Sequence, residues 1–354
     1  MTRPARIAVV GAGLVGQAHI KRVLEEPEAT LVGVADPSPQ SKAQAETLAV
    51  PWAADIETLL VRDKPDGVVI ATPNQLHVAN GMAAVGAGVP MLLEKPVADD
   101  VDSGLRLVEA AEKAGVPILV GHHRRHSPLI RRAREIVASG RLGRIVAVNG
   151  LCWFHKPSDY FEGRNSWRRE PGGGVVLINL IHVVDDLRNL CGDVIGVQAA
   201  DSCAARGFTV EDTAAIILRF ANGALGTLTI SDAASAPWSW ELTSGENKAY
   251  PHTDQFCYLV AGTDGSLTVP RLDCWHHTGE GWWTPIASER VIVPEQDPLT
   301  LQMRHFVEVI RGEAKPLVSG REGILTLEAT LAVKRAAVTG DVVRLLGPGG
   351  DRTP

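Results

Sequence analysis

Three glycines and an aspartate near the start of the chain have the spacing of a dinucleotide-binding site. The apolar run Arg6–Val10 leads directly into a glycine motif over residues 11–16, and a helical pattern follows to Glu26. A second apolar run, Thr30–Ala35, ends at Asp36. In a strand–turn–helix unit, such glycines allow a tight turn, a close backbone approach to a pyrophosphate and close packing of helix on sheet. The N–H groups at the helix start can then bind phosphate oxygens.

Asp36 favours one nicotinamide cofactor over the other. A carboxylate at the end of the second strand accepts hydrogen bonds from the adenosine ribose hydroxyls and repels a 2′-phosphate. No arginine occurs in residues 37–41. We therefore expect NAD, with NADP less favoured, although Lys42 leaves room for the use of both.

A lysine at another strand end could act on a substrate oxygen. Glu94-Lys95-Pro96 closes the apolar run that begins at Pro90. An ammonium at this place can hold the oxygen by a hydrogen bond and balance the charge that develops on it. A surface lysine at a strand end is the alternative, and the motif by itself does not decide between them.

A histidine in a strongly apolar helical pattern is the second candidate for proton chemistry. His182 follows the run Gly172–Gly174, and Asn179 and Asp185 lie three residues on either side of it. Residues three apart share a helix face, so we expect these side chains on one stripe. An imidazole backed by a carboxylate accepts a proton near neutral pH. A core histidine satisfied by Asp185 or Asp186 is the alternative, but the glycine run, which permits a backbone or ligand to approach closely, favours a site.

Aromatic and arginine side chains gather just before the glycine run. Trp167 and Arg168, within five residues of Gly172, are the candidates for substrate contacts. Aromatic faces suit the C–H faces of a sugar ring, and a guanidinium suits hydroxyl or carboxylate oxygens. Plain core and loop packing is the alternative for each of these residues taken singly.

The first part of the chain has the pattern of an α/β fold. Short apolar runs alternate with helical stretches near 39–49, 75–87 and 101–115, which predicts a doubly wound parallel sheet of the Rossmann type. The apolar runs are Arg6–Val10, Thr30–Ala35, Gly67–Ala71, Pro90–Glu94 and Pro117–Gly121. Ligands on such sheets bind at the carboxyl ends of the strands, so the segments 11–16, 36, 72–74, 94–96 and 121–123 should form one rim.

The later part of the chain has a different pattern. Beyond Gly143 the apolar and polar residues alternate, which predicts a mostly antiparallel sheet with one exposed face in an α+β domain. The expected strands are Arg144–Val148, Ala214–Phe220, Ala224–Ser231 and Trp238–Leu242. Turns are expected at Asn222-Gly223 and at residues 263–265, and helices at 298–311 and 321–339. We therefore predict domains over 1–122 and 123–346, followed by a tail over 347–354.

Composition narrows the class of protein. The net charge of −6 argues against nucleic-acid or membrane-surface partners, and no apolar run approaches the ~20 residues that span a bilayer. The first strand begins by Arg6, too early for a signal peptide. The five cysteines include no C-x-x-C pair, so we expect a cytoplasmic protein without structural zinc. Among the histidines of residues 122–126, Arg124 and Arg125 would repel a cation, so we expect no metal.

The order of these motifs resembles the Gfo/Idh/MocA family, which includes glucose–fructose oxidoreductase, inositol dehydrogenases and dihydrodiol dehydrogenases. The motifs that carry the resemblance are the glycine turn with Asp36, Thr72-Pro73-Asn74 with His77, Glu94-Lys95-Pro96, and the glycine-run helix with His182. The resemblance covers essentially the whole chain. It implies an NAD-binding Rossmann domain, a C-terminal domain for substrate and oligomer contacts with an open-faced sheet, and hydride transfer at a carbon that bears oxygen, on a sugar, cyclic polyol or related ring.

The resemblance also implies roles for single residues. Lys95 matches the catalytic lysine of the family and His182 its catalytic histidine. The family commonly has an aspartate four residues before that histidine, where this chain has Ile178. Asn179 is the nearest polar residue, and its amide can orient a hydroxyl but cannot exchange a proton in this role. The departure shifts proton transfer to His182, with Lys95 as its partner.

The expected site therefore comprises three groups of residues. The catalytic residues are Lys95, His182 and Asn179. The cofactor-binding residues are Gly11, Gly13, Leu14, Val15, Gly16, Asp36, Thr72, Asn74, His77, Glu94 and Lys95. The substrate-binding residues are His123, Arg124, Trp167, Arg168, Asn179 and His182. We expect the substrate to lie between the nicotinamide and the helix of His182, in a homo-oligomer, a dimer or tetramer, formed through the C-terminal sheet.

Together these features predict an NAD-dependent dehydrogenase for a secondary alcohol of a cyclic polyol or sugar, inositols and pyranoses first. A reductase of a small ketone or imine and a cis-dihydrodiol dehydrogenase remain open as other chemistries of the same class. A non-catalytic NAD-binding sensor or assembly subunit also remains open. Ile178 supports that last alternative, whereas the presence of Lys95 and His182 counts against it.

Overall fold

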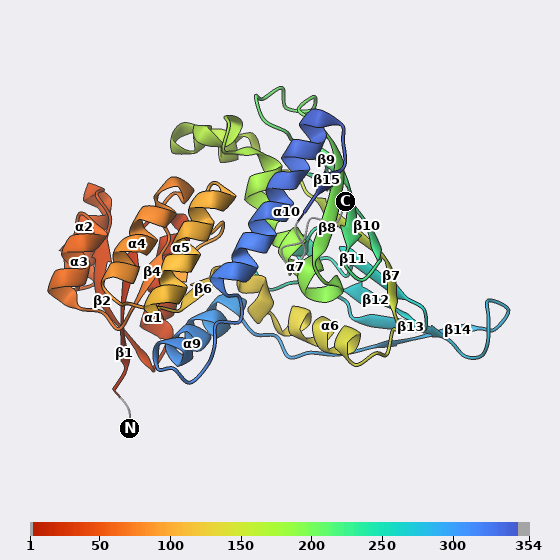
Figure 1. Cartoon of the computed structure of the whole chain (residues 1–354), viewed down its shortest axis with the longest axis horizontal. Coiled ribbons are helices and arrows are strands. Elements are labelled where there is room, and N and C mark those ends of the chain that lie inside the picture. The colour runs from red at the N-terminus through yellow and green to blue at the C-terminus, as the bar shows by residue number, and fades with distance from the viewer. Residues whose placement is uncertain (1–2, 346–354) are drawn as a thin grey trace. The chain divides into compact units, whose positions relative to one another are not determined.

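A computed structural model describes residues 3–345 of the chain, whose course is drawn in Figure 1. The chain divides into two compact units. The first comprises the chain up to His126 together with Pro298–Leu327, and the second comprises Ser127–Asp297 and the chain from Glu328 onward. The predicted tail over 347–354 lies outside the described residues.

The first unit is built on a six-stranded parallel sheet in the order β3-β2-β1-β4-β5-β6. Its strands are β1 (Ala5–Val10), β2 (Ala29–Ala35), β3 (Trp52–Ala53), β4 (Gly67–Ile70), β5 (Met91–Leu93) and β6 (Ile118–Val120). Successive residues of a strand face opposite sides of the sheet. In β1, Ala8 and Val10 join one apolar core while Ile7 and Val9 join another, so the sheet is buried on both faces. The predicted doubly wound parallel sheet is confirmed.

Helices cover both faces of this sheet. The N-terminal part of the unit supplies α1 (Leu14–Glu25), α2 (Pro39–Thr47), α3 (Ile56–Asp63), α4 (His77–Gly86) and α5 (Val101–Ala114). Side chains that accept backbone N–H groups fix the helix starts, as Asp55 does for α3 and Asp100 for α5. Gly115, at φ +68°, ends α5.

A later helix completes the first unit. Phe306 of α9 (Pro298–Ile310) is fully buried in the core beneath α1, and Ile310 contacts Gly67 of β4. This packing explains why Pro298–Leu327 groups with the first unit, although the sequence placed it in the second domain. The domain boundary at residue 122 stays a prediction.

The second unit is built on a nine-stranded sheet in the order β14-β13-β12-β11-β7-β10-β9-β8-β15. Its strands are β7 (Ile145–Trp153), β8 (Val194–Ser202), β9 (Thr213–Phe220), β10 (Leu225–Ser231), β11 (Tyr258–Gly262), β12 (Ser266–Val269), β13 (Asp273–His277), β14 (Ile286–Arg290) and β15 (Val343–Arg344). All neighbouring pairs are antiparallel except β7 with β10, which is parallel. The predicted, mostly antiparallel sheet is thus confirmed.

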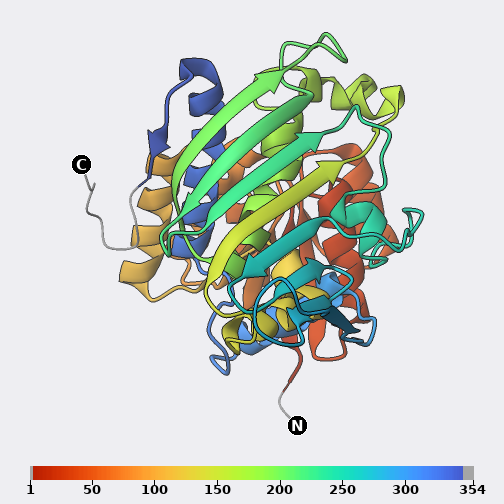
Figure 2. The ribbon, with the colours of Figure 1, turned by 90° about the vertical axis from the view of Figure 1, so that its right-hand side faces the viewer.

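The register places alternate residues of this sheet on a buried and an open face. One row across the strands is buried and comprises Val197, Leu218, Gly226, Val148, Val260 and Leu267. Ile217 and Leu259 lie one residue along on their strands and are 44% and 38% exposed. Apolar residues of α6 (Pro128–Ala138), α7 (Ile181–Cys191) and the second half of α10 (Gly320–Thr339) pack on the buried face. Figure 2 looks onto the open face.

The observed elements also correct the sequence analysis. The hairpin at Asn222-Gly223 and the turn at residues 263–265 join the expected strands, β9 to β10 and β11 to β12. The predicted strand Trp238–Leu242 is wrong, because α8 (Trp240–Thr243) forms there. The backbone carbonyl of Ser239 accepts the Thr243 N–H and hydroxyl, so a helical turn satisfies these groups locally.

Candidate functional site

The carboxyl ends of the parallel strands meet at one edge of the first sheet. The segments that follow β1, β2, β4, β5 and β6 at this edge are residues 11–16, Asp36, Thr72–Asn74, Glu94–Lys95 and Gly121–His123. Backbone hydrogen bonds tie them together, from Glu94 N–H to Ile70 O at 2.9 Å and from Gly121 N–H to Leu93 O at 2.7 Å. The edge is therefore a continuous rim of loops, as the sequence predicts.

The glycine turn leaves space where a dinucleotide phosphate would need it. A Cβ on Gly16 would lie 1.9 Å from the carbonyl oxygen of Gly11, so only glycine fits there. A Cβ on Gly13 would meet no atom within 4 Å, and Leu14 above it is 78% exposed. Helix α1 begins at Leu14 without a side-chain cap from Gly13, so its first N–H groups remain available for an anion. These features fit the pyrophosphate of a dinucleotide.

Asp36 is held in a fixed orientation beside the glycine turn. Its Oδ2 accepts the Ala12 N–H and its Oδ1 accepts the Ser38 N–H, both at 2.8 Å. Burial acts to raise the pKa of Asp36, but these hydrogen bonds outweigh it and lower the pKa below the ordinary value. The carboxylate is therefore ionised at neutral pH and keeps acceptor lone pairs for hydroxyl donors.

His77 links two loops of the rim. Its Nδ1 lies 2.7 Å from Pro96 O and its Nε2 lies 2.9 Å from Thr72 O. The ring is fully buried, and burial lowers the pKa of His77. Thr72 Oγ1 also accepts a hydrogen bond from Asn80 at 3.1 Å. Any influence of His77 on a cofactor therefore passes through the loops of Thr72 and Pro96.

A buried ion pair supports the loop that carries Lys95. Glu94 Oε1 lies 2.8 Å from His19 Nε2 of α1, and Oε2 accepts the Lys95 N–H at 3.2 Å. Burial would raise the pKa of Glu94, but the hydrogen bond and charge of His19, with Lys95 and His123, lower it to about 2. A Cβ on Gly121 would lie 2.8 Å from the Glu94 carboxyl group. Lys95, joined to Pro96 by a cis peptide bond, is partly exposed above this pair.

The segment His123–His126 forms a short 3₁₀ helix, η2, at the end of the first unit. Burial, followed by the nearby charge of Arg124, lowers the pKa of His123 to about 4, so this imidazole is neutral at physiological pH. Arg124 is itself 4% exposed. His126 Nε2 lies 2.8 Å from Nδ1 of His305 on α9. The substrate contacts predicted for His123 and Arg124 stay predictions.

In the second unit, the glycine run allows close packing at the start of the His182 helix. A Cβ on Gly173 would lie 2.6 Å from Arg168 O, and a Cβ on Gly174 would lie 2.4 Å from Glu211 Oε1. The first turn after the glycines is a π-helix, η5 (Val176–Leu180), and α7 follows it. Glu211 Oε1 accepts the Val176 N–H at 3.1 Å. A π-helical turn inserts a residue into the helix, and such turns frequently occur at functional sites.

The stripe that the sequence predicts is accessible at one end and buried at the other. Asn179 and His182 are both partly exposed, as are Leu177 and Ile178, whereas Asp185 is buried. Asp186 is buried too, and its Oδ2 accepts the Tyr258 hydroxyl at 2.9 Å. Asn179 and His182 thus share the accessible part of this segment. His182 and Asp185 lie three residues apart in the regular helix α7, which keeps them on one side of the helix, with the carboxyl group of Asp185 buried.

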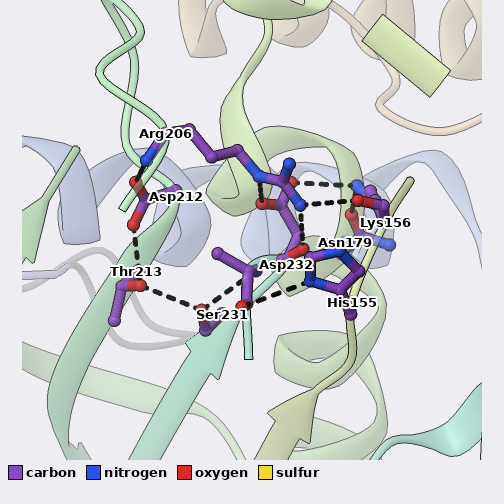
Figure 3. Close-up of polar contacts among 9 residues, drawn as sticks. His155, Lys156, Asn179, Arg206, Asp212, Thr213, Ser231 and Asp232 are labelled. Carbon is purple, nitrogen blue, oxygen red and sulfur yellow. Dashed lines mark hydrogen bonds and ion pairs between the residues drawn. The ribbon is translucent and has the colours of Figure 1, made fainter. Parts of the chain in front are cut away.

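A lysine that the sequence analysis did not select contacts Asn179. Lys156, in the loop after β7, is 6% exposed and donates from Nζ to Asn179 Oδ1 at 2.6 Å (Figure 3). Its Nζ also lies 3.4 Å from Asp232 Oδ2, while Arg206 Nε donates to Asp232 Oδ1 at 2.7 Å. Burial lowers the pKa of Lys156 to about 8, although Asp232 acts to raise it.

The predicted aromatic and arginine residues lie around the same loop. The Arg168 Cζ atom lies 3.8 Å from the centre of the Tyr160 ring, and Arg168 donates to Tyr160 O at 2.7 Å. Lys156 Nζ lies 4.6 Å from the same ring centre. Trp167 is 49% exposed beside Arg168, whose Cζ lies 5.7 Å from its ring centre. Arg168 and Lys156 therefore concentrate positive charge at one tyrosine.

His19 and Lys156, which the sequence analysis did not select, each have a sequence context that could have indicated a buried polar contact. His19 lies three residues after Gly16, on the buried side of an amphipathic helix, where a histidine needs a polar partner. Lys156 comes two residues after the aromatic pair Trp153-Phe154, whose rings can cover the aliphatic stem of a lysine. Their partners Glu94 and Asp232 are 75 and 76 residues away respectively, and only the fold reveals such pairings.

Comparison with known proteins places both units in one family. Residues 5–122 match the model of an oxidoreductase family with an NAD-binding Rossmann fold, and residues 130–268 match the Gfo/Idh/MocA C-terminal domain. The chain is 28% identical to the 1,5-anhydro-D-fructose reductase of Ensifer adhaerens, over 82% of this chain and 83% of that protein. It is 30% identical to inositol 2-dehydrogenase 4 of Saccharopolyspora erythraea, over 64% of this chain and 67% of that protein.

A solved structure is similar over nearly the full length. The WlbA dehydrogenase of Bordetella pertussis, solved in complex with NADH and UDP-GlcNAcA, superposes with a TM-score of 0.80 and 26% sequence identity. The match covers 97% of this chain and 99% of that one. Within residues 3–345, no helix has the length and apolar character needed to cross a membrane. Because models of both its N-terminal and its C-terminal domain match, the chain belongs to the Gfo/Idh/MocA family of oxidoreductases, and its first unit is an NAD-binding Rossmann fold.

Proposed function

We propose that this oxidoreductase transfers a hydride between a secondary alcohol of a cyclic polyol or sugar and NAD. The residues proposed to bind the cofactor are those of the rim, from the glycine turn and Asp36 to Thr72, Asn74, Glu94 and Lys95. Bound there, the nicotinamide supplies the hydride acceptor or donor. The names of the relatives, an inositol dehydrogenase and an anhydrofructose reductase, support this substrate class.

Lys95 has the role of stabilising the reacting oxygen. Its backbone is tied to the buried Glu94 carboxylate, and its side chain extends from the edge of the sheet that also carries the glycine turn. An ammonium at this edge donates a hydrogen bond to an oxygen that becomes alkoxide-like during oxidation, which lowers the barrier to hydride loss. This location of Lys95 is the single observation that carries the proposal.

His182 has the role of proton acceptor. It lies on the accessible part of the helix with Asn179, where an imidazole can take the proton of a substrate hydroxyl during oxidation and return it during reduction. Asn179 and Arg168 orient the substrate through hydrogen bonds. Because Asn179 cannot exchange a proton in this role, proton transfer rests on His182 with Lys95 as its partner.

Replacement of the two proposed catalytic side chains tests the function. Lys95→Met and His182→Ala should each lower kcat by about 10²–10⁴-fold, the range for loss of an oxyanion donor or a general base. Both variants should still bind NADH, followed by its fluorescence, because the glycine turn and Asp36 are unchanged. Any loss of affinity should be confined to Lys95→Met, since Lys95 also belongs to the proposed cofactor site. The substrate panel is read by NADH absorbance. Near-normal turnover in both variants would overturn the proposal.

Reduction is the second direction that a specific observation favours. One relative is named a reductase, and the same residues serve both directions when the proton and hydride return to a ketone. A panel that includes ketones with NADH therefore belongs to the same test.

We also propose a cytoplasmic location, supported by five cysteines that form no disulfide.

A further inference from the structure

Lys156 is a buried cation whose charge is only partly compensated. The only carboxylate within ion-pair distance of Nζ in the described part of the chain is Asp232, at 3.4 Å. That carboxylate lies closer to Arg206, at 2.7 Å, so two cations share it. Asp212 accepts the backbone N–H of Arg206 and the Thr213 hydroxyl instead. A buried ammonium that shares its counter-ion gains from a further anion nearby.

The ammonium also fixes the orientation of the Asn179 amide. Lysine has donors and no acceptor when it is charged, so the Asn179 atom that faces Nζ at 2.6 Å must be the carbonyl oxygen. The amide nitrogen then points away from Lys156, and within residues 3–345 it donates to no protein group. Asn179 is partly exposed, so this N–H₂ group is presented to a ligand as a pure donor.

The Lys156 backbone is as firmly held as its side chain. Its N–H donates to Asp232 O at 2.8 Å, and its carbonyl oxygen accepts from Arg206 Nη2 at 2.9 Å. The side chain is enclosed by the rings of Phe154 and Tyr160, with Nζ 5.3 Å and 4.6 Å from their centres. Because these contacts leave the side chain little freedom, the amide that it orients is preorganised as well.

We propose that Lys156 and Asn179 form a carboxylate-binding part of the substrate site, so that the enzyme acts on polyol or sugar acids in preference to neutral polyols. This inference rests on the proposed function and narrows its substrate class. Asn179 touches the carboxylate through its N–H₂ group, and Lys156 is a positioning residue that also supplies the countercharge behind the amide. An amide donor backed by a cation favours an anionic oxygen over a hydroxyl, which is neutral.

The proposal predicts a particular pH dependence. Burial sets the pKa of Lys156 to about 8, against the opposing influence of Asp232, Cys152 and Glu241. The ammonium is charged below this pH and loses its proton above it, so KM for an acid should rise above pH 8. The neighbouring Arg206 shares the Asp232 carboxylate with Lys156, and burial raises the pKa of Tyr160 above its ordinary value. KM for a neutral sugar should not change in the same interval.

Matched pairs of neutral and acidic sugars test the proposal on the full-length, NAD-loaded enzyme. The pairs are glucose with glucuronate and galactose with galacturonate, with myo-inositol as a further neutral compound. The acid of at least one pair should have a kcat/KM about 10- to 100-fold above its neutral partner, the value of one charge-assisted hydrogen bond. Lys156→Met should remove that preference mainly through KM, and the exposed-site control Lys113→Met should retain it.

A second variant guards against misfolding of Lys156→Met. Asn179→Asp keeps an oxygen against Lys156 but presents a carboxylate to the ligand, so KM should rise more for the acid of each pair than for its neutral partner. If neutral sugars match or exceed their acids in every pair, or if both variants keep the preference, the proposal is overturned while the proposed function stands. If no compound turns over, calorimetric titration with the same pairs decides. If the wild type binds the acids and Lys156→Met does not, the carboxylate site is supported although the proposed function fails. If the wild type binds no acid, or if Lys156→Met binds the acids as well as the wild type does, the carboxylate site is overturned.

Discussion

Replacement of His19 by leucine should destabilise the first unit and remove the part of its acid sensitivity that Glu94 contributes. His19 and Glu94 are 1% and 8% exposed, and the Nε2–Oε1 distance is 2.8 Å. In His19→Leu, the Glu94 carboxylate keeps the Lys95 N–H, at 3.2 Å from its Oε2. A buried carboxylate that loses its partner retains the full cost of its lost hydration, so the change removes more than one hydrogen bond.

The size of the effect follows from the pKa of Glu94. The folded protein lowers it from 4.5 to about 2, and at about 1.4 kcal/mol per pH unit the shift corresponds to at most about 4 kcal/mol of folding free energy. Because the folded-state pKa is the lower one, this contribution is fully present above pH 4.5 and is lost as the pH falls toward 2. His19 provides the largest favourable share of the shift, so we expect a loss of about 2 kcal/mol at pH 7 in His19→Leu.

A double-mutant cycle at two pH values measures this coupling. Urea unfolding of the wild type, His19→Leu, Glu94→Gln and the double variant at pH 7 should give a coupling energy of about 2 kcal/mol between the two positions. At pH 3 the stability of the wild type should fall toward that of His19→Leu. The reasoning is refuted if the coupling stays below about 0.5 kcal/mol, the usual error of additivity, or if both proteins lose the same stability in acid.

Three further predictions concern the cofactor and the open sheet. Gly16→Ala places a methyl group 1.9 Å from Gly11 O, so NADH affinity measured by fluorescence should fall at least about 10-fold, while Gly86→Ala, where a Cβ meets no atom within 4 Å, should not lower it. Asp36→Ser removes the charge that repels a 2′-phosphate, so the ratio of NADP to NAD in kcat/KM should rise about 10-fold, and an unchanged ratio would contradict the assignment. We also propose that the open face of the large sheet joins copies of the chain. Ile217→Glu with Leu259→Glu should then lower the mass measured by light scattering, and an unchanged mass would exclude that face as the interface.

The first unit could be predicted well from the sequence because local signals and the global fold agree there. The apolar strands, the glycine turn and Asp36 follow one another in the order and at the spacing that a strand–turn–helix unit requires. The short strand β3 and helix α3 were missed, since two residues such as Trp52–Ala53 carry no measurable pattern. The return of α9 to the first unit was missed as well, because an amphipathic helix shows which face is apolar but not which sheet covers it.

The second unit was less predictable at the positions that matter most for chemistry. The apolar run after the glycines has the pattern of one regular helix, and nothing in it predicts the π-turn at Val176–Leu180 that precedes His182. Trp238–Leu242 has the aromatic content of a strand, but hydrogen bonds to Ser239 favour a helical turn. The π-turn is supported by a contact between distant residues, Glu211 with the Val176 N–H, which no sequence window contains.

The amide at position 179 and the burial of Lys156 explain each other. A carboxylate in place of Asn179 would give Lys156 two anionic neighbours, Asp232 and the new group, and its ammonium would then be fully compensated. An amide leaves the positive charge incompletely balanced and offers its N–H₂ group to a ligand. Ile178 in place of the family's usual aspartate is therefore compatible with an active enzyme. In our proposal the neighbouring Asn179 acts as a donor for an anionic substrate group, and His182 keeps the proton chemistry.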